Sequence, residues 1–285
     1  MLGMNSPEMF WPLGFFNLWH PVMIIILIAL GWLYLYSVRS KLGKASLLKA
    51  FFFFIGLFAF YVAEGSPLHA LGHYYLFSAH MLSMSITYFL VPPLILSGLY
   101  DWMVDPLLKN RVWRGGLRFL TNPILGMLSF NVLLSLYHVP VIFNFIMRVT
   151  WVMVLANSIL IFFAFIMWWL VFTPTEKNTR VLTDFQKLGY VFASSVILTP
   201  ACALIMFADH FLYIKTASEV TILHFLPPLQ DQKSGGVIMK IMQEMVFIGV
   251  LASIIYKWAK KERDPQANDL NPSIHVDRWQ QSDFK

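Results

Sequence analysis

Apolar residues along this 285-residue chain gather in seven runs that are separated by shorter polar stretches. A helix needs about 20 predominantly apolar residues to cross the hydrocarbon core of a bilayer. The seven runs have about this length and lie near residues 18–38, 47–63, 74–99, 122–145, 149–172, 187–213 and 236–257. The pattern predicts an all-α, polytopic membrane protein, with a seven-helix transmembrane domain over residues 1–258 and a polar, cytoplasmic tail over residues 259–285.

The composition agrees with this prediction and excludes several classes of function. Apolar residues make up 58% of the chain and charged residues only 13%, whereas soluble domains carry about 25% charged residues. The net charge of +6 comes from basic residues near the ends of the spans, so it does not indicate nucleic-acid binding. The sequence shows no phosphate-binding glycine loop and no nucleophile–base pair, which predicts a protein that is not an enzyme and binds no nucleotide.

The basic residues also orient the spans, because cytoplasmic loops of membrane proteins are rich in Lys and Arg. Seventeen Lys and Arg residues lie after the first, third, fifth and seventh runs, and four lie on the other side. This asymmetry predicts an N-terminus outside and a C-terminus in the cytoplasm, with membrane lipid around the bundle.

With that orientation, seven of the eight histidines fall on the outer side: His20, His69, His73, His80, His138, His210 and His224. Three of them, His69, His73 and His224, are assigned to loops, where a histidine can simply bond to water. In contrast, His80 lies about two turns inside the third span. An ionisable side chain at such a depth is costly and by default functional.

Helical spacing places methionine and cysteine side chains on the same helix faces as two of the histidines. His80 and Met84 are four residues apart, and Cys202, Met206 and His210 would form a stripe on one face of the sixth helix. Thiolate, thioether and imidazole together suit Cu(I). The predicted metal ligands are therefore His80, Met84, His138, Cys202, Met206 and His210, although methionines are also ordinary packing residues.

The stretch before the last span combines acceptors and glycines. Asp231, Gln232 and Gly236 are predicted to bind a ligand in a loop, and the alternative is an acidic residue at a helix N-terminus. Proline predicts two further features: a bend or unwound turn at Pro92-Pro93 in the third span, and a kink at Pro200 in the sixth.

Two of these places resemble one known family. The stretch that begins with His80-Met81 and ends with Pro92-Pro93 and Gly98 resembles the third-helix signature of the CtaG family of cytochrome c oxidase assembly factors, which are found with caa-type oxidases. Asp231-Gln232, with glycines and a methionine after it, is similar to the motif that opens the last helix of that family. The spans match over roughly residues 15–258.

One departure from the family pattern concerns Met84, where many members carry a second histidine. A thioether in this place keeps a pair that is competent for Cu(I). It weakens the case for zinc, Cu(II) or a haem held by two histidines.

The resemblance implies an assembly factor in the plasma membrane of a bacterium. Such a protein would help a haem–copper oxidase to acquire copper from the outer side, with oxidase subunits as partners. Two alternatives stay open from the residues alone. One is an electron-transfer protein with a b-type haem between His80 and either His138 or His20. The other is a transporter of copper or another small solute, with Lys240, Glu244 and the kink at Pro200 in its pathway.

Overall fold

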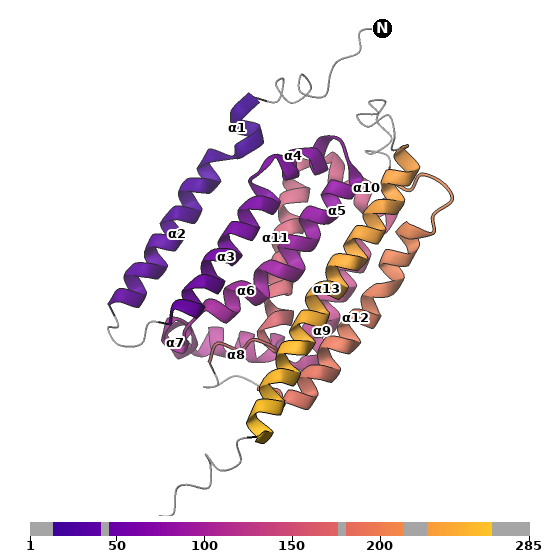
Figure 1. Ribbon diagram of the computed structural model, residues 1–285. Coiled ribbons are helices and arrows are strands. Elements are labelled where there is room, and N and C mark those ends of the chain that lie inside the picture. Colours follow the sequence, from indigo (N-terminus) through magenta and orange to yellow (C-terminus); the bar gives the residue numbers. More distant parts are fainter. Residues whose placement is uncertain (1–13, 41–45, 176–180, 214–226, 264–285) are drawn as a thin grey trace, which may run out of the picture.

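The computed structural model describes residues 14–40, 46–175, 181–213 and 227–263, and all regular secondary structure in these ranges is helical. Figure 1 shows long helices side by side, with the short helices α4 and α10 at one end of the bundle and α7 and α8 at the other. The predicted all-α class is confirmed. Within the described ranges, six helices are long and apolar enough to cross a membrane, and a seventh span is counted if one bent pair of helices is taken together.

The first half of the chain forms α1 (Gly14–Trp19), α2 (Pro21–Arg39), α3 (Leu47–Glu64), α4 (Pro67–Tyr74), α5 (Phe77–Ser85), a π-helical stretch η2 (Ile86–Leu90), α6 (Val91–Gly98) and α7 (Asp101–Lys109). The second half forms α8 (Arg111–Leu120), α9 (Pro123–Tyr137), α10 (Pro140–Arg148), α11 (Thr150–Trp169), α12 (Asp184–Met206) and α13 (Pro228–Arg263).

The third span, formed by α5, η2 and α6, is the most buried of the six. Sequence predicts a bend or an unwound turn at Pro92-Pro93, and the structure instead carries the helix through both prolines after a π-helical turn. Pro92 has no N–H to give to the carbonyl of Tyr88, four residues earlier. The indole Nε1 of Trp168 donates to that carbonyl at 3.1 Å, so the buried acceptor is satisfied from α11.

Aromatic side chains hold this central span against its neighbours. The ring of Phe89 lies 6.1 Å from Phe130 on α9 and 5.9 Å from Phe247 on α13. Trp168 of α11 lies 5.2 Å from Phe247. All four side chains are fully buried, so four helices meet at one aromatic layer in the middle of the bundle.

The fourth predicted span, residues 122–145, is wrong in its second half. The helix stops at Tyr137, and α10 begins at Pro140, because a proline cannot donate the backbone bond that would continue α9. By itself α9 is short for a span. It qualifies only together with α8, from which it is bent by 72°.

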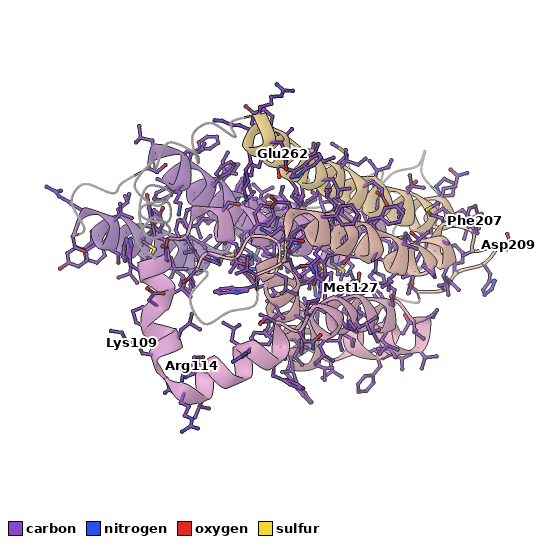
Figure 2. All side chains as sticks on the ribbon, turned by 90° about the horizontal axis from the view of Figure 1, so that it is seen from below. Lys109, Arg114, Met127, Phe207, Asp209 and Glu262 are labelled. Atoms are coloured by element: carbon purple, nitrogen blue, oxygen red, sulfur yellow. The ribbon has the colours of Figure 1, made fainter. Side chains whose placement is uncertain are left out.

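The basic residues collect at the end of the bundle that carries α7 and α8. Figure 2 shows Lys109 and Arg114 on these two helices, which stand out from the rest of the molecule. The last turn of α13, with Lys260, Lys261 and Arg263, lies at the same end. The side of the membrane that this end faces remains a prediction. Of the predicted tail, residues 259–263 continue α13, and residues 264–285 lie outside the described ranges.

Candidate functional site

The histidines of the described residues lie at the end of the bundle opposite α7 and α8, which we call the histidine end: His20, His69, His73, His80, His138 and His210. Their predicted collection at one end is thereby confirmed for these six, and His224 lies outside the described residues. The contacts of each side chain decide which of them can act together.

The assignment of His69 and His73 to a loop is wrong, because both lie on α4. Ser66 caps this helix by accepting a hydrogen bond from the N–H of Leu68 at 3.2 Å, and Pro67 occupies its first position. The helix stacks the two imidazole rings, with centroids 6.0 Å apart and an angle of 4° between the planes. A serine followed by a proline is a helix-start signal that could have placed these histidines from sequence.

His20 and Glu64 extend the row of imidazoles on the other side of His69. The ring of His20 lies 5.5 Å from that of His69, and His69 Nδ1 lies 3.3 Å from Glu64 Oε2. The second carboxylate oxygen of Glu64 accepts a hydrogen bond from Thr87 Oγ1 at 2.8 Å. Helices α3 and α4, the π-helical stretch η2 and the residue before α2 therefore contribute to one polar cluster.

His20 precedes α2 and is the one non-glycine residue with a positive φ, 38°, in the described ranges. Burial lowers the pKa of His20, the nearby His69 lowers it further, and Glu64 acts in the opposite direction. Nδ1 of His20 is buried and has no hydrogen-bond partner among the described residues. The net shift favours the neutral imidazole, which is the form that ligates metals.

His80 lies in the first turns of α5, against α4 and α9. Its Nε2 is 3.3 Å from the hydroxyl of Tyr137, and its ring meets Phe143 of α10 edge to face at 5.7 Å. A Cβ on Gly72 would lie 2.7 Å from the backbone N and Cα of His80. Only a glycine at this position lets α4 lie so close to α5, and this close approach brings His73 next to His80.

A small cavity of about 10 Å³ lies between these elements, and its walls include His73, His80, Phe77, Phe143 and Met147. This volume corresponds to roughly one water molecule. His73, His80 and Met147 thus line a space large enough for about one water molecule. No local pattern in the sequence singles out Met147, because its place beside His80 depends on the break between α9 and α10.

Two other predicted ligands are buried near His80 without sharing this cavity's wall. Met84 is one turn further along α5 and only 3% exposed. His138 is 1% exposed, and its Nδ1 lies 2.7 Å from the carbonyl of Leu134. If Nδ1 carries the proton, Nε2 keeps a lone pair, and Nε2 has no partner within the described part of the chain.

The predicted stripe on the sixth helix is wrong in its last member. Helix α12 ends at Met206, and His210 lies beyond it, exposed. Gln232 holds the segment that follows α12. Its Nε2 donates to the carbonyl of His210 at 3.4 Å, and its Oε1 accepts from the N–H of Leu212 at 3.0 Å. Cys202, 1% exposed, is packed inside the bundle.

Asp231, predicted to lie in a loop, belongs to the first turn of α13. Its carboxylate accepts hydrogen bonds from the N–H of Phe77 at 2.7 Å, from the N–H of Ser78 at 3.2 Å and from the hydroxyl of Ser78. No residue of α5 caps its own start, so Asp231 does so from another helix. The negative charge also lies at the positive end of the α5 dipole.

Two glycines after Asp231 let α13 approach both neighbours. A Cβ on Gly235 would lie 2.6 Å from the ring of Phe77, and one on Gly236 would lie 3.0 Å from side-chain atoms of Ile205 and Met206. The Asp-Gln and Gly-Gly pairs therefore have a structural role, joining α13 to α5 and α12. The binding role predicted for Asp231, Gln232 and Gly236 stays a prediction.

Residues 29–261 of the chain match the family described as cytochrome c oxidase caa3 assembly factor, Caa3_CtaG. The chain belongs to this family. The match runs from the middle of α2 almost to the end of α13, so it includes both motifs that suggested the relationship. No curated protein and no solved structure matches the chain.

The donor set at the histidine end of this Caa3_CtaG protein limits the kind of metal it could hold. In the ranges that the structure describes, no three side chains of His, Cys, Asp or Glu are placed to hold a metal ion together. A site with three protein ligands would therefore include a residue of another type, and methionine sulfur is a soft donor that suits Cu(I). Met147 lines the small cavity together with His73 and His80.

Proposed function

We propose that this protein helps to mature a caa3-type cytochrome c oxidase by handling Cu(I), as cargo, at the histidine end of the bundle. The observation that carries the proposal is the cavity lined by His73, His80 and Met147 in a member of an oxidase assembly family. Its donors are soft or borderline and its volume fits one ion. The cargo changes ligands without any bond being made or broken in a substrate, so the role is not enzymatic.

The arrangement of the other histidines supports a route to this cavity. His20 lies beside His69, and His69 is stacked on His73, which lines the cavity. Copper could pass along such a row by exchange of one imidazole for the next. The predicted orientation puts the row on the outer side of a bacterial plasma membrane, from which an oxidase subunit would receive the ion.

A deletion strain tests the assembly role. We expect the oxidase polypeptides to be made at normal levels while oxidase activity and oxidase-bound copper fall at least several-fold. Restoring the gene on a plasmid should restore both. Normal activity and normal copper content in the deletion strain would refute the proposal.

Copper analysis of the purified protein under reducing conditions tests the cavity itself. His80→Ala and Met147→Leu should each lower bound Cu(I) by about tenfold or more. Met127→Leu, four residues after the start of α9, is the matched control and should retain wild-type copper. Loss of copper in Cys202→Ser but not in His80→Ala would place the site on α12 instead.

A further inference from the structure

An ion pair lies on the side of the bundle, away from the histidine end. Lys240 Nζ lies 2.6 Å from Glu244 Oε1 and donates to the hydroxyl of Thr199 at 2.8 Å. The hydroxyl of Ser195 donates to the same carboxylate oxygen at 2.7 Å. The pair thus bridges α13 and α12.

The depth of this pair follows from α12. Ser195 is eleven residues from either end of this 23-residue helix, or about 16 Å at 1.5 Å per residue. Glu244 therefore meets α12 at its midpoint. In a spanning helix this level is the centre of the hydrocarbon core, where a charged side chain is costly.

The pair is also partly open to the surroundings of the bundle. The side chains of Lys240 and Glu244 are 24% and 36% exposed. The neighbouring positions on the same faces are exposed apolar residues, Val196 of α12 at 53% and Ile248 of α13 at 61%. An acyl chain packed here would cover the apolar residues but could form no hydrogen bond with the charged side chains.

We infer that this surface of α12 and α13, defined by Lys240, Glu244, Val196 and Ile248, is the docking surface for a transmembrane helix of an oxidase subunit. The docked helix would carry a hydroxyl or amide side chain near its midpoint. The inference rests on the proposed assembly role. Every hydrogen bond that the structure shows at the carboxylate ends at Oε1, which leaves Oε2 to accept from the partner.

A second copy of this chain fits this docking surface less well. Two copies related by a twofold axis along the membrane normal would place Lys240 opposite Lys240 and Glu244 opposite Glu244 at equal depths. Like charges at that level repel each other in a medium of low dielectric constant. A helix with a neutral hydrogen-bonding group meets no such repulsion.

Site-specific photocrosslinking in membranes that contain the oxidase tests this surface. A photoreactive residue at Val196 or at Ile248 should form an adduct with an oxidase subunit, identified by mass spectrometry. The matched control is Ile159, which is 40% exposed in the middle of α11, and its adduct yield should be at least tenfold lower. The double variant Lys240→Met/Glu244→Gln should reduce the adducts from Val196 and Ile248 by a similar factor. This variant removes both charges and keeps the side-chain volumes, so the bundle should still fold.

Three results would overturn the inference: adducts with lipid alone, adducts with a second copy of this chain alone, or an equal yield from Ile159. The deletion strain separates this inference from the proposed function. Defective oxidase in that strain, without adducts from Val196 or Ile248, would leave the assembly role intact and refute the docking surface. Normal oxidase in that strain would refute the assembly role itself.

Discussion

Helix α13 carries two polar clusters that differ in how completely the protein encloses them. At its start, Asp231 and Gln232 are 4% and 0% exposed, and their side chains form hydrogen bonds with the start of α5 and with the segment after α12. Nine residues after Asp231, Lys240 begins the second cluster, in which Lys240 and Glu244 are bonded to α12 and still partly exposed. A polar cluster that is enclosed by the protein stabilises the fold. A charged cluster that is partly exposed at mid-depth needs a polar partner from outside the chain.

The largest effect should come from Asp231→Ala. The substitution leaves two backbone N–H groups at the start of α5 and the hydroxyl of Ser78 without their acceptor. Each unsatisfied buried group costs about 1–3 kcal/mol, so we expect a loss of roughly 3 kcal/mol or more. Thermal unfolding of the protein in detergent measures this loss. Asp209→Ala, an exposed carboxylate at the same end, should change stability by less than about 0.5 kcal/mol. Equal effects of the two substitutions would contradict the capping role.

The next largest effect should come from Lys240→Leu, which tests the charges of the second cluster. Lys240→Leu alone leaves the Glu244 carboxylate without its cation at mid-depth, which should cost about 2 kcal/mol and lower the amount of protein in the membrane. Adding Glu244→Leu removes the orphaned charge and should restore most of that amount. Quantitative immunoblots of membranes give the comparison. A double variant that is less abundant than the single variant would show that the pair stabilises the fold in the way that Asp231 does.

These two clusters also show how far the sequence could lead. The apolar runs predict most of the spans, and the Asp-Gln motif points to a special contact before the last span. The partner of Asp231 is Phe77, 154 residues away, and no local pattern contains that pairing. The same reason hides Met147, whose place beside His80 depends on the break at Pro140 and on the packing of α10.

Glycine substitutions on α13 test whether the close packing of α13 against α5, beside the enclosed cluster, contributes to stability. Gly235→Ala would place a Cβ 2.6 Å from the ring of Phe77, and overpacking of this kind costs about 1–3 kcal/mol. Gly249→Ala on the same helix meets nothing within 4 Å and should be neutral or slightly stabilising, because alanine favours the helix. Melting temperatures of both variants, measured side by side, decide the point. A stable Gly235→Ala variant would mean that α5 and α13 can separate at little cost.

The smallest effect on stability should come from Tyr137→Phe, which tests what the enclosed cluster holds in place. Asp231 fixes the start of α5, and His80 is three residues beyond Phe77 on that helix, with its Nε2 3.3 Å from the Tyr137 hydroxyl. Removing the hydroxyl deletes one hydrogen bond at a half-buried imidazole, so stability should fall by only about 1 kcal/mol or less. If copper is ligated through His80, the loss of this bond frees the ring to turn, and Cu(I) affinity should change by more than the melting temperature suggests. A competition titration with a Cu(I) chelator measures the affinity. An unchanged affinity, with His80→Ala still deficient in copper, would show that α4 and α10 orient the ring without help from Tyr137.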